Sequence, residues 1–304
     1  MTARLTLALL FIVPAALAYP WQTVTSRWVL GAAVAVVVIV FAWWRGEFVT
    51  TLLGRRWAIL GRRIRPPQPA AAPVDRASIL LRIEASDVDE LPVPLIAGYA
   101  DRYGLRCDKV RITSRDVDGR RQTWVGLTLA AQDNLAALQA RSARIPLYDT
   151  AEIVSRRLAD HLRESGWTVT AVEGGQPDPV QVEARESWRA LSDGAGFVSA
   201  YAIPVQDLPE VLASVWAHPT LETWTAVEFG PDTAAALVAL RTAEAPASSA
   251  PVPGLVRLGG RQRPALDALN LHAAQRLDGH SPAGADLAGR LNWPAGALQA
   301  RVRT

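Results

Sequence analysis

The sequence predicts an α+β protein: two N-terminal transmembrane helices, then a two-layer α/β cytosolic domain with a mixed or antiparallel sheet. Three observations carry this prediction. Residues 28–44 contain no charged or amide side chain. A stiff Pro/Ala-rich linker at residues 66–76 follows the membrane region. Beyond the linker, strand-like and helix-like segments alternate, and the tight turn Asp118-Gly119 joins two of the strands as a hairpin.

The second apolar run, residues 28–44, is long enough to cross a bilayer. As a helix, about seventeen residues rise roughly 26 Å, close to the ~30 Å hydrocarbon core. Tryptophan at both ends of the run suits the headgroup boundary. Arginine is concentrated beyond one end only, at Arg45, Arg55, Arg56, Arg62, Arg63 and Arg65. These arginines outnumber Arg27 on the other side, so the positive-inside rule places the chain after residue 45 in the cytosol.

The first apolar run, residues 5–18, has two interpretations. One is a signal peptide that is cleaved after Ala18. The other is a first transmembrane helix over residues 5–24, kinked at its internal proline. We favour the helix, because Pro20 disfavours cleavage and a retained hairpin needs only a short turn. Residues 1–45 are then a transmembrane hairpin, and the protein is a multi-pass component of the cell (inner) membrane.

Apolar side chains and arginine clusters alternate along residues 46–65, and this pattern predicts a basic juxtamembrane helix. Such a helix lies on anionic lipid or docks a partner subunit. The alternative is a plain flank that stops membrane transfer. On the first interpretation, we expect ten residues to make membrane-interface or partner contacts: Trp28, Trp43, Trp44, Arg45, Arg55, Arg56, Trp57, Arg62, Arg63 and Arg65.

Residues 77–242 predict the α+β domain. Apolar runs and turn residues predict strands at residues 79–83, 105–113, 122–130, 167–172, 197–203, 221–229 and 234–242. Helical spacing or turn signals predict helices at residues 92–103, 134–141, 149–165, 182–191 and 207–217. Composition predicts a linker with a small C-terminal element at residues 243–271, and a loose tail over residues 272–304.

The segment 149–165 carries the clearest helix pattern of this domain. Asp149 and Glu152 resemble a capping box at its start. The predicted buried stripe consists of Ile153, Val154, Leu158 and Leu162. Gly166 then ends the helix.

Composition excludes several classes of function. The formal net charge is only +3, which argues against binding to nucleic acid. Cys107 is the single cysteine, so no intrachain disulfide exists, and a buried strand position suits it better than a nucleophile. Lys109, the single lysine, lacks the glycine-rich context of a P-loop. Dinucleotide-binding, hydrolase-elbow and zinc-protease motifs are absent too, so we predict no catalytic, cofactor-binding or metal-binding residue, no cofactor, and no small-molecule substrate.

Two D-x-D sequences are the strongest remaining candidates for chemistry. Asp87 with Asp89, or Asp116 with Asp118, could hold a divalent ion and a sugar-nucleotide diphosphate. The second pair falls on the predicted hairpin turn, where aspartate is favoured for its conformation alone. We therefore favour the turn interpretation.

The histidines and one glycine-rich stretch are weaker candidates. His161 could act in acid–base or metal chemistry, but a half-exposed helix position explains it more simply. His272 and His280 lie alone in the predicted tail. Residues 254–266 could cradle a phosphate with glycine and arginine, although a turn before a helix is the commoner meaning.

The order of several segments resembles one known family. They are the basic stretch 46–65 behind the second span, VPLIAGYADRYG at residues 93–104, TWVGLTL at 123–129, NLAALQARS at 134–142, and IPL at 145–147 leading into ADHLRESGW at 159–167. In this order they resemble the EccE subunit of type VII (ESX) secretion membrane complexes. The resemblance covers residues 1–270 and departs from the family pattern in the short segment 66–91.

The resemblance implies a two-span inner-membrane subunit with a cytosolic domain. Members of the family assemble with the EccB, EccC and EccD subunits, and EccC supplies the ATPase. The missing P-loop agrees with that division of labour. The resemblance carries over no catalytic residues.

Two hypotheses about function remain. The first is a non-enzymatic subunit that contributes to assembly or stability of a secretion complex through its cytosolic domain. The second is a membrane-anchored, nucleotide-sugar-dependent transferase that uses a D-x-D pair. We favour the first, because a membrane anchor joins a packed domain without a convincing active site.

Overall fold

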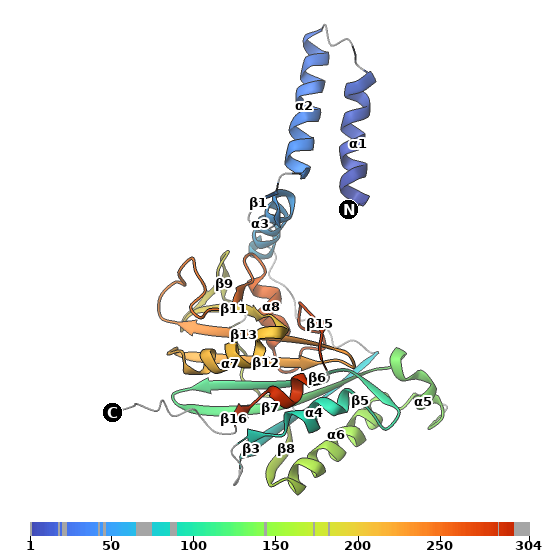
Figure 1. The fold of residues 1–304 in the computed structure, drawn as a ribbon, viewed down its shortest axis with the longest axis vertical. Helices are drawn as coiled ribbons and strands as arrows, with labels where there is room; N and C mark the ends of the chain where they lie inside the picture. The colour runs from blue at the N-terminus through green and yellow to red at the C-terminus, as the bar shows by residue number, and fades with distance from the viewer. Residues whose placement is uncertain are drawn as a thin grey trace. The chain divides into compact units, whose positions relative to one another are not determined.

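The computed structural model describes residues 2–17, 19, 23–41, 43–44, 47–64, 75–85, 90–142, 145–172, 174–181, 183–284 and 286–294. The chain divides into two compact units, Met1–Pro67 and Gln68–Thr304. The first unit is helical and the second is built around one large sheet (Figure 1).

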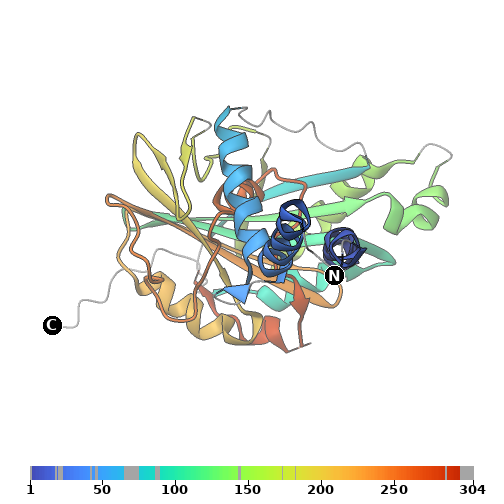
Figure 2. The same ribbon diagram turned by 90° about the horizontal axis from the view of Figure 1, so that it is seen from above.

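The N-terminal unit contains three helices and one short β-ribbon. Its elements are α1 (Thr2–Leu17), α2 (Val24–Phe41), β1 (Trp43–Trp44), β2 (Glu47–Phe48) and α3 (Val49–Ile64). Helices α1 and α2 lie side by side in both Figures 1 and 2. Ala15 and Ala33 are buried, as expected where small side chains let two helices approach closely. Among the described residues, the structure contains no helix that is both long enough and apolar enough to span a membrane.

The second unit is α+β with an antiparallel sheet, which confirms the predicted fold class of this part. The strands follow the order β8-β3-β7-β6-β12-β13-β11-β10-β9. Their bounds are β3 (Arg76–Ala85), β6 (Leu105–Val117), β7 (Arg120–Ala130), β8 (Trp167–Val172), β9 (Arg185–Glu186), β10 (Leu191–Asp193), β11 (Gly196–Ile203), β12 (Glu222–Phe229) and β13 (Thr233–Thr242). Short strands pair at the margins: β4 (Glu90–Leu91), β5 (Asp101–Arg102), β14 (Val256–Arg257), β15 (Ser281–Pro282) and β16 (Trp293–Pro294).

Helices complete the layers on the sheet. They are α4 (Val93–Ala97), α5 (Leu135–Gln139), α6 (Leu147–Glu164), α7 (Leu208–Ala217), α8 (Gln262–Leu269) and α9 (Leu287–Arg290), with 3-10 turns η1 (Gly98–Ala100), η2 (Gln132–Asn134) and η3 (Val205–Asp207). One core cluster joins α6 and α7 to the sheet. A second cluster contains α8 and a stacked pair, Trp124 and Trp224, whose ring centroids are 6.1 Å apart. Two clusters of apolar side chains therefore flank the sheet, as alternation along strands requires.

The predicted hairpins are confirmed. Strands β6 and β7 pair across a turn at Asp118 and Gly119, both of which have positive φ. Strands β12 and β13 pair in the same way, from Glu222 opposite Arg241 to Phe229 opposite Ala234. The strand predicted at residues 234–242 is thus part of the sheet.

Several details of the predicted helices were wrong. The helix predicted at residues 92–103 ends earlier, because Asp101–Arg102 form β5. Of the helix predicted at residues 182–191, the described residues 183–191 are not helical, because β9 and β10 form a hairpin in which Ser187 N–H donates to the Ala190 carbonyl at 2.8 Å. Helix α6 begins at Leu147 after Pro146, without a side-chain cap, so Asp149 and Glu152 form no capping box. Ile153 is exposed. The remaining predicted stripe of α6 is buried, and Gly166 follows its end with positive φ.

The prediction of a loose tail from residue 272 was wrong as far as the described residues extend. Trp293 is 0% exposed, and its Nε1–H donates to Ser114 Oγ at 2.8 Å. Leu287 and Leu291 belong to the same core cluster. Strand β15 also pairs with β13. A few apolar side chains spaced along an Ala/Gly/Arg-rich segment are enough to bind it to the sheet.

Candidate functional site

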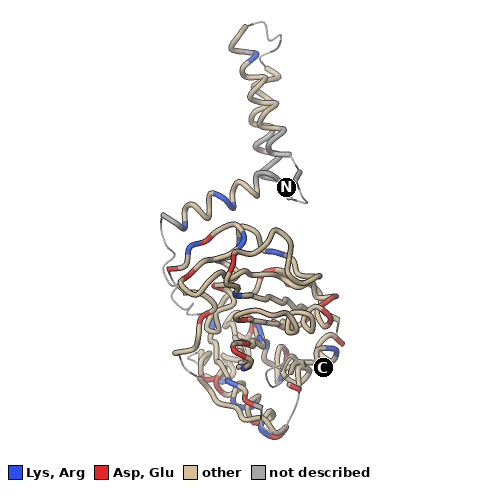
Figure 3. The backbone as a smooth tube through the Cα atoms, turned by 90° about the vertical axis from the view of Figure 1, so that its left-hand side faces the viewer, with Lys and Arg blue, Asp and Glu red and all other residues tan. Residues whose placement is uncertain are grey.

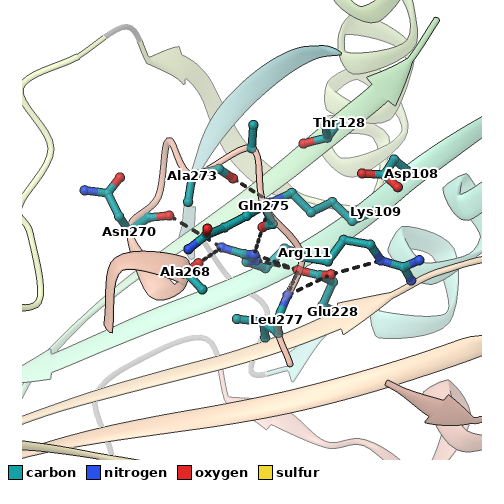
Figure 4. Close-up of polar contacts among 12 residues, drawn as sticks. Asp108, Lys109, Arg111, Thr128, Glu228, Ala268, Asn270, Ala273, Gln275 and Leu277 are labelled. Carbon is teal, nitrogen blue, oxygen red and sulfur yellow. Dashed lines mark hydrogen bonds and ion pairs between the residues drawn. The ribbon is translucent and has the colours of Figure 1, made fainter. Parts of the chain in front are cut away.

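A buried polar network lies on the sheet face that packs α8, where β6 and β12 are neighbours. Its side chains are Lys109, Arg111 and Glu228, and they contact the segment 268–280 that follows α8 (Figure 4). Arg111 and Glu228 are direct cross-strand partners. Their strand neighbours Val110, Ile112, Val227 and Phe229 face the opposite core cluster. Strand alternation therefore places the charged groups together on one face.

The central contact is a buried ion pair. Glu228 is 0% exposed and Arg111 is 4% exposed. Arg111 Nε and Nη2 both donate to Glu228 Oε2, at 2.9 and 2.7 Å. Arg111 also donates to the backbone carbonyls of Ala268 at 2.6 Å and Gln275 at 3.0 Å. The guanidinium thus links the two strands to the segment that follows α8.

Lys109 shares this face with Arg111, which is two residues away, and a bulge lies just before Lys109. The register of β6 against β7 shifts between Cys107 and Lys109, so that Asp108 is an extra residue. Without the bulge, Cys107 and Lys109 would face the same way. Lys109 is 3% exposed, and its Nζ donates to the carbonyls of Ala273 and Gln275 at 2.5 and 2.6 Å. Lys109 and Arg111 therefore both bind carbonyls of residues 268–280.

The other oxygen of Glu228 binds residues from the C-terminal segment. His280 Nε2 lies 2.9 Å from Glu228 Oε1, and Leu277 N–H donates to the same atom at 3.3 Å. Arg276 Nη2 lies 3.0 Å from His280 Nδ1. Arginine can only donate, so Nδ1 accepts and the ring proton sits on Nε2, from which it is donated to Glu228. Both carboxylate oxygens of Glu228 therefore accept hydrogen bonds.

The network shifts the pKa of two of its groups. Burial alone would raise the pKa of Glu228, but the His280 hydrogen bond and the charge of Arg111 outweigh it and lower the pKa to about 2. Burial lowers the pKa of Lys109 to about 7, and the positive charge of Arg111 acts in the same direction. Glu228 is therefore a permanent anion at neutral pH, whereas Lys109 is near its titration point.

The arrangement is suited to holding a segment rather than to chemistry. The space beside Lys109, Arg111 and Thr128 measures about 20 Å³, which is room for roughly one water molecule. The donors of Lys109 and Arg111 described above bind backbone carbonyls or Glu228. A buried, shifted pKa can mark an active site, but in the described part of the chain the space beside these groups is too small for a substrate.

The residues predicted to contact a membrane or a partner lie in the N-terminal unit. Trp28 lies on α2 and is 75% exposed. Trp43 and Trp44 form β1. Arg55, Arg56, Trp57, Arg62 and Arg63 lie on α3, whose arginines appear as blue segments in Figure 3. Trp57 is 69% exposed, and Leu53 and Leu60 are also exposed at helical spacing from it. Arg45 and Arg65 lie outside the described residues.

The structure gives structural roles to most of the residues considered for catalysis or metal binding. Cys107 is buried in β6, and burial raises the pKa of its thiol to about 12. His161 is half-buried on α6, and its Nδ1 lies 2.6 Å from the Tyr99 hydroxyl. Asp116 pairs with Arg121 at 2.7 Å, and Asp118 is in the hairpin turn with positive φ. The other D-x-D pair, within residues 86–89, lies outside the described residues.

One further candidate follows the simpler interpretation. Residues 254–266 contain a turn, strand β14 and the first part of α8. Within the described ranges, no group of three or more His, Cys, Asp or Glu side chains is placed to hold a metal ion. The first D-x-D pair lies outside those ranges.

Sequence reasoning missed the network. Lys109 was considered only as a P-loop lysine, and His280 only as a tail residue. The available signal was alternation: Lys109-Val110-Arg111-Ile112 in β6 and Val227-Glu228-Phe229 in β12 place single charges between apolar residues. A charged side chain that points from a strand into the core needs an oppositely charged partner, and a neighbouring strand can supply it.

Comparison with known proteins gives a consistent assignment. Residues 117–203 match the family model described as "Putative type VII ESX secretion system translocon, EccE". The chain is 53% identical over 284 residues to the ESX-3 secretion system protein EccE3 of Mycolicibacterium smegmatis, covering 92% of this chain and 91% of that protein. It is 47% identical over 302 residues to the ESX-3 secretion system protein EccE3 of Mycobacterium tuberculosis, covering 96% and 91% of the two chains.

Proposed function

This chain belongs to the EccE family of type VII (ESX) secretion-system proteins, and we propose that it is a non-enzymatic membrane subunit of a secretion complex. The observation that carries the proposal is the near full-length similarity to two EccE3 proteins, extending through both units. On this proposal, the domain contributes to assembly or stability, and its partners are the EccB, EccC and EccD subunits and the lipid bilayer.

The proposed anchor is a hairpin of two transmembrane helices over residues 5–24 and 28–44. The apolar run between Trp28 and Trp44 supports it, as does the packing of α1 against α2 through small residues. The arginines after residue 44 support a cytosolic domain at the inner membrane.

We infer that α3 lies at the membrane interface or against a partner subunit. Leu53, Trp57 and Leu60 form an exposed apolar stripe along one side of this helix. Arg55, Arg56 and Arg62 lie on the same helix, with Arg63 and Arg65 at and beyond its end. An apolar stripe combined with arginine is typical of helices that bind anionic lipid headgroups.

Labelling of introduced cysteines tests the topology. The single native cysteine, Cys107, is buried, so the wild-type chain provides a low background. A membrane-impermeant maleimide should label Thr25→Cys in intact cells, because residue 25 lies in the turn between the two proposed spans, on the outer side. It should label Ser248→Cys, on an exposed loop, only after lysis. Labelling of Ser248→Cys in intact cells would contradict a cytosolic domain.

Complementation separates this proposal from the transferase alternative. A strain that lacks the chain should lose export through its secretion system, and the wild-type chain should restore it. Asp87→Asn with Asp89→Asn, or Asp118→Asn alone, should restore export equally. Asparagine tolerates the left-handed conformation of residue 118, so that variant removes the charge and keeps the turn. Failure of these variants, at normal protein levels, would favour catalysis by a D-x-D pair.

A further inference from the structure

A cavity of about 230 Å³ lies on the sheet face that packs α7, away from the buried network. Its lining comes from β11, β13, the end of α7, the loop of residues 244–251 and β14. Ser199 and Tyr201 of β11 lie two residues apart and so share one face of the strand. The register places Tyr201 opposite Arg257 of β14. Two polar side chains, Ser199 and Arg257, therefore meet at this cavity.

Both side chains have hydrogen-bond donors without a partner in the described part of the chain. Ser199 is 2% exposed, and its hydroxyl makes no hydrogen bond there. Arg257 Nε and Nη1 are also buried and unpartnered, while Nη2 donates to the Ser249 carbonyl at 2.7 Å. The guanidinium carbon lies 5.1 Å from the centroid of the Tyr201 ring. Buried donors in folded proteins almost always have an acceptor, so these groups point to a missing one.

The chemistry of the lining selects the ligand. Arg257 is a permanent cation, and none of the ion pairs among the described residues includes it. Leu240, Pro246 and Ala247 supply apolar walls. At about 30 Å³ per water molecule in the liquid, the cavity holds roughly eight water-sized groups, below the ~300 Å³ of the smallest drug-sized pockets. This volume suits a short aliphatic body.

We propose that this cavity binds a carboxylate attached to a short aliphatic body, with Arg257 and Ser199 as its hydrogen-bond donors. The carboxylate has two sources with the same chemistry: a free short-chain acid, or the C-terminal residue of a polypeptide. The proposal does not depend on the secretion role, because it rests on the cavity alone.

One carboxylate of the protein opposes this ligand. Glu244 lines the cavity on its exposed side. Its negative charge repels an entering anion, so its removal strengthens binding of a carboxylate. The same substitution weakens binding of a cation. Nonspecific binding would not show these opposite changes in affinity.

The test uses the full chain in a mild detergent and measures binding by saturation-transfer NMR and calorimetry. The probes are pentanoate, pentylamine as the cationic control, and acetyl-Ala-Val with either a free or an amidated C-terminus. We expect at least one carboxylate probe to bind, and its amine or amide counterpart not to bind. Binding of pentanoate alone identifies a free acid, and binding of the free-acid peptide alone identifies a polypeptide terminus.

Variants assign the binding to this cavity. Arg257→Met should weaken it by at least about tenfold, the size expected for loss of a charged hydrogen bond. Ser199→Ala should weaken it several-fold, and Glu244→Gln should strengthen it. Arg290→Met, on an exposed surface pair, should change nothing. The account is overturned if neither carboxylate probe binds, or if binding persists unchanged in both Arg257→Met and Ser199→Ala with normal thermal melting.

Discussion

Replacing Glu228 with glutamine should release the C-terminal segment from the sheet. The substitution keeps the shape of the side chain and removes its charge. Arg111 would then be a buried cation without a counter-ion, next to Lys109, and Arg276, whose Nε lies 3.5 Å from Glu228 Oε1, would lose the same counter-ion. Breaking a buried pair by removing one partner costs about 3–5 kcal/mol. Glutamine can still accept from Arg111 and from Leu277 N–H, so we expect a loss near the lower limit, about 3 kcal/mol.

A surface pair provides the matched control. Glu152 and Arg156 of α6 form an i,i+4 pair at 2.5 Å, with side chains 42% and 71% exposed. Glu152→Gln removes the same charge where solvent screens it, so it should cost less than about 1 kcal/mol. Both free energies of unfolding are measured by urea titration of the full chain in detergent. Hydrogen exchange of residues 268–280 reports on the segment directly, and it should accelerate in Glu228→Gln alone.

The pH dependence gives a second check on the same variant. The pKa of Glu228 is about 2 in the folded chain, against an ordinary value of 4.5. Its stabilising contribution is therefore complete above about pH 5 and is lost as the pH falls toward 2. The difference in stability between wild type and Glu228→Gln should shrink over that range. Equal losses for Glu228→Gln and Glu152→Gln, or unchanged exchange at residues 268–280, would refute the reasoning.

Three further predictions concern other parts of the chain. Burial lowers the pKa of Lys109 from 10.5 to about 7, so the free-energy cost of burying its charge is full below pH 7 and is relieved as the pH rises toward 10.5. Between pH 7 and 10.5, the wild type should therefore gain stability relative to Lys109→Met, as measured by urea titration. Gly254→Ala should destabilise the domain by about 2 kcal/mol or more, because residue 254 has positive φ and the new Cβ would overlap Val211 Cγ2. Gly279→Ala, also at positive φ but with open space around it, should cost only about 1–2 kcal/mol. Thermal melting compares the two variants. Trp57→Glu should reduce binding of the chain to anionic vesicles more than Tyr148→Glu does, and equal binding would remove α3 from the proposed interface.

Local patterns predicted much of the domain, since local rules govern hairpins and amphipathic helices. The Asp118-Gly119 turn and the stripe of Val154, Leu158 and Leu162 were readable because short-range geometry determines them. The buried position of Trp293 was not readable, because its partners Ser114 and Trp216 are distant in sequence. Composition had predicted disorder there.

The polar network was hidden for a similar reason. Alternation places Lys109 and Arg111 on one face of β6, but a single sequence does not show that this face packs against residues 268–280. The pairing of Arg111 with Glu228 also depends on strands that are over a hundred residues apart. The charges were visible in the sequence, but their arrangement depends on the order of the strands.

The size and composition of the native complex test the central claim most directly. The chain is tagged at its C-terminus in its own host, the membranes are dissolved in a mild non-ionic detergent, and the purified material is sized and analysed by mass spectrometry. The account predicts a large assembly that contains the EccB, EccC and EccD subunits. A lone monomer, without any of these subunits under conditions that keep their own complex intact, would contradict it.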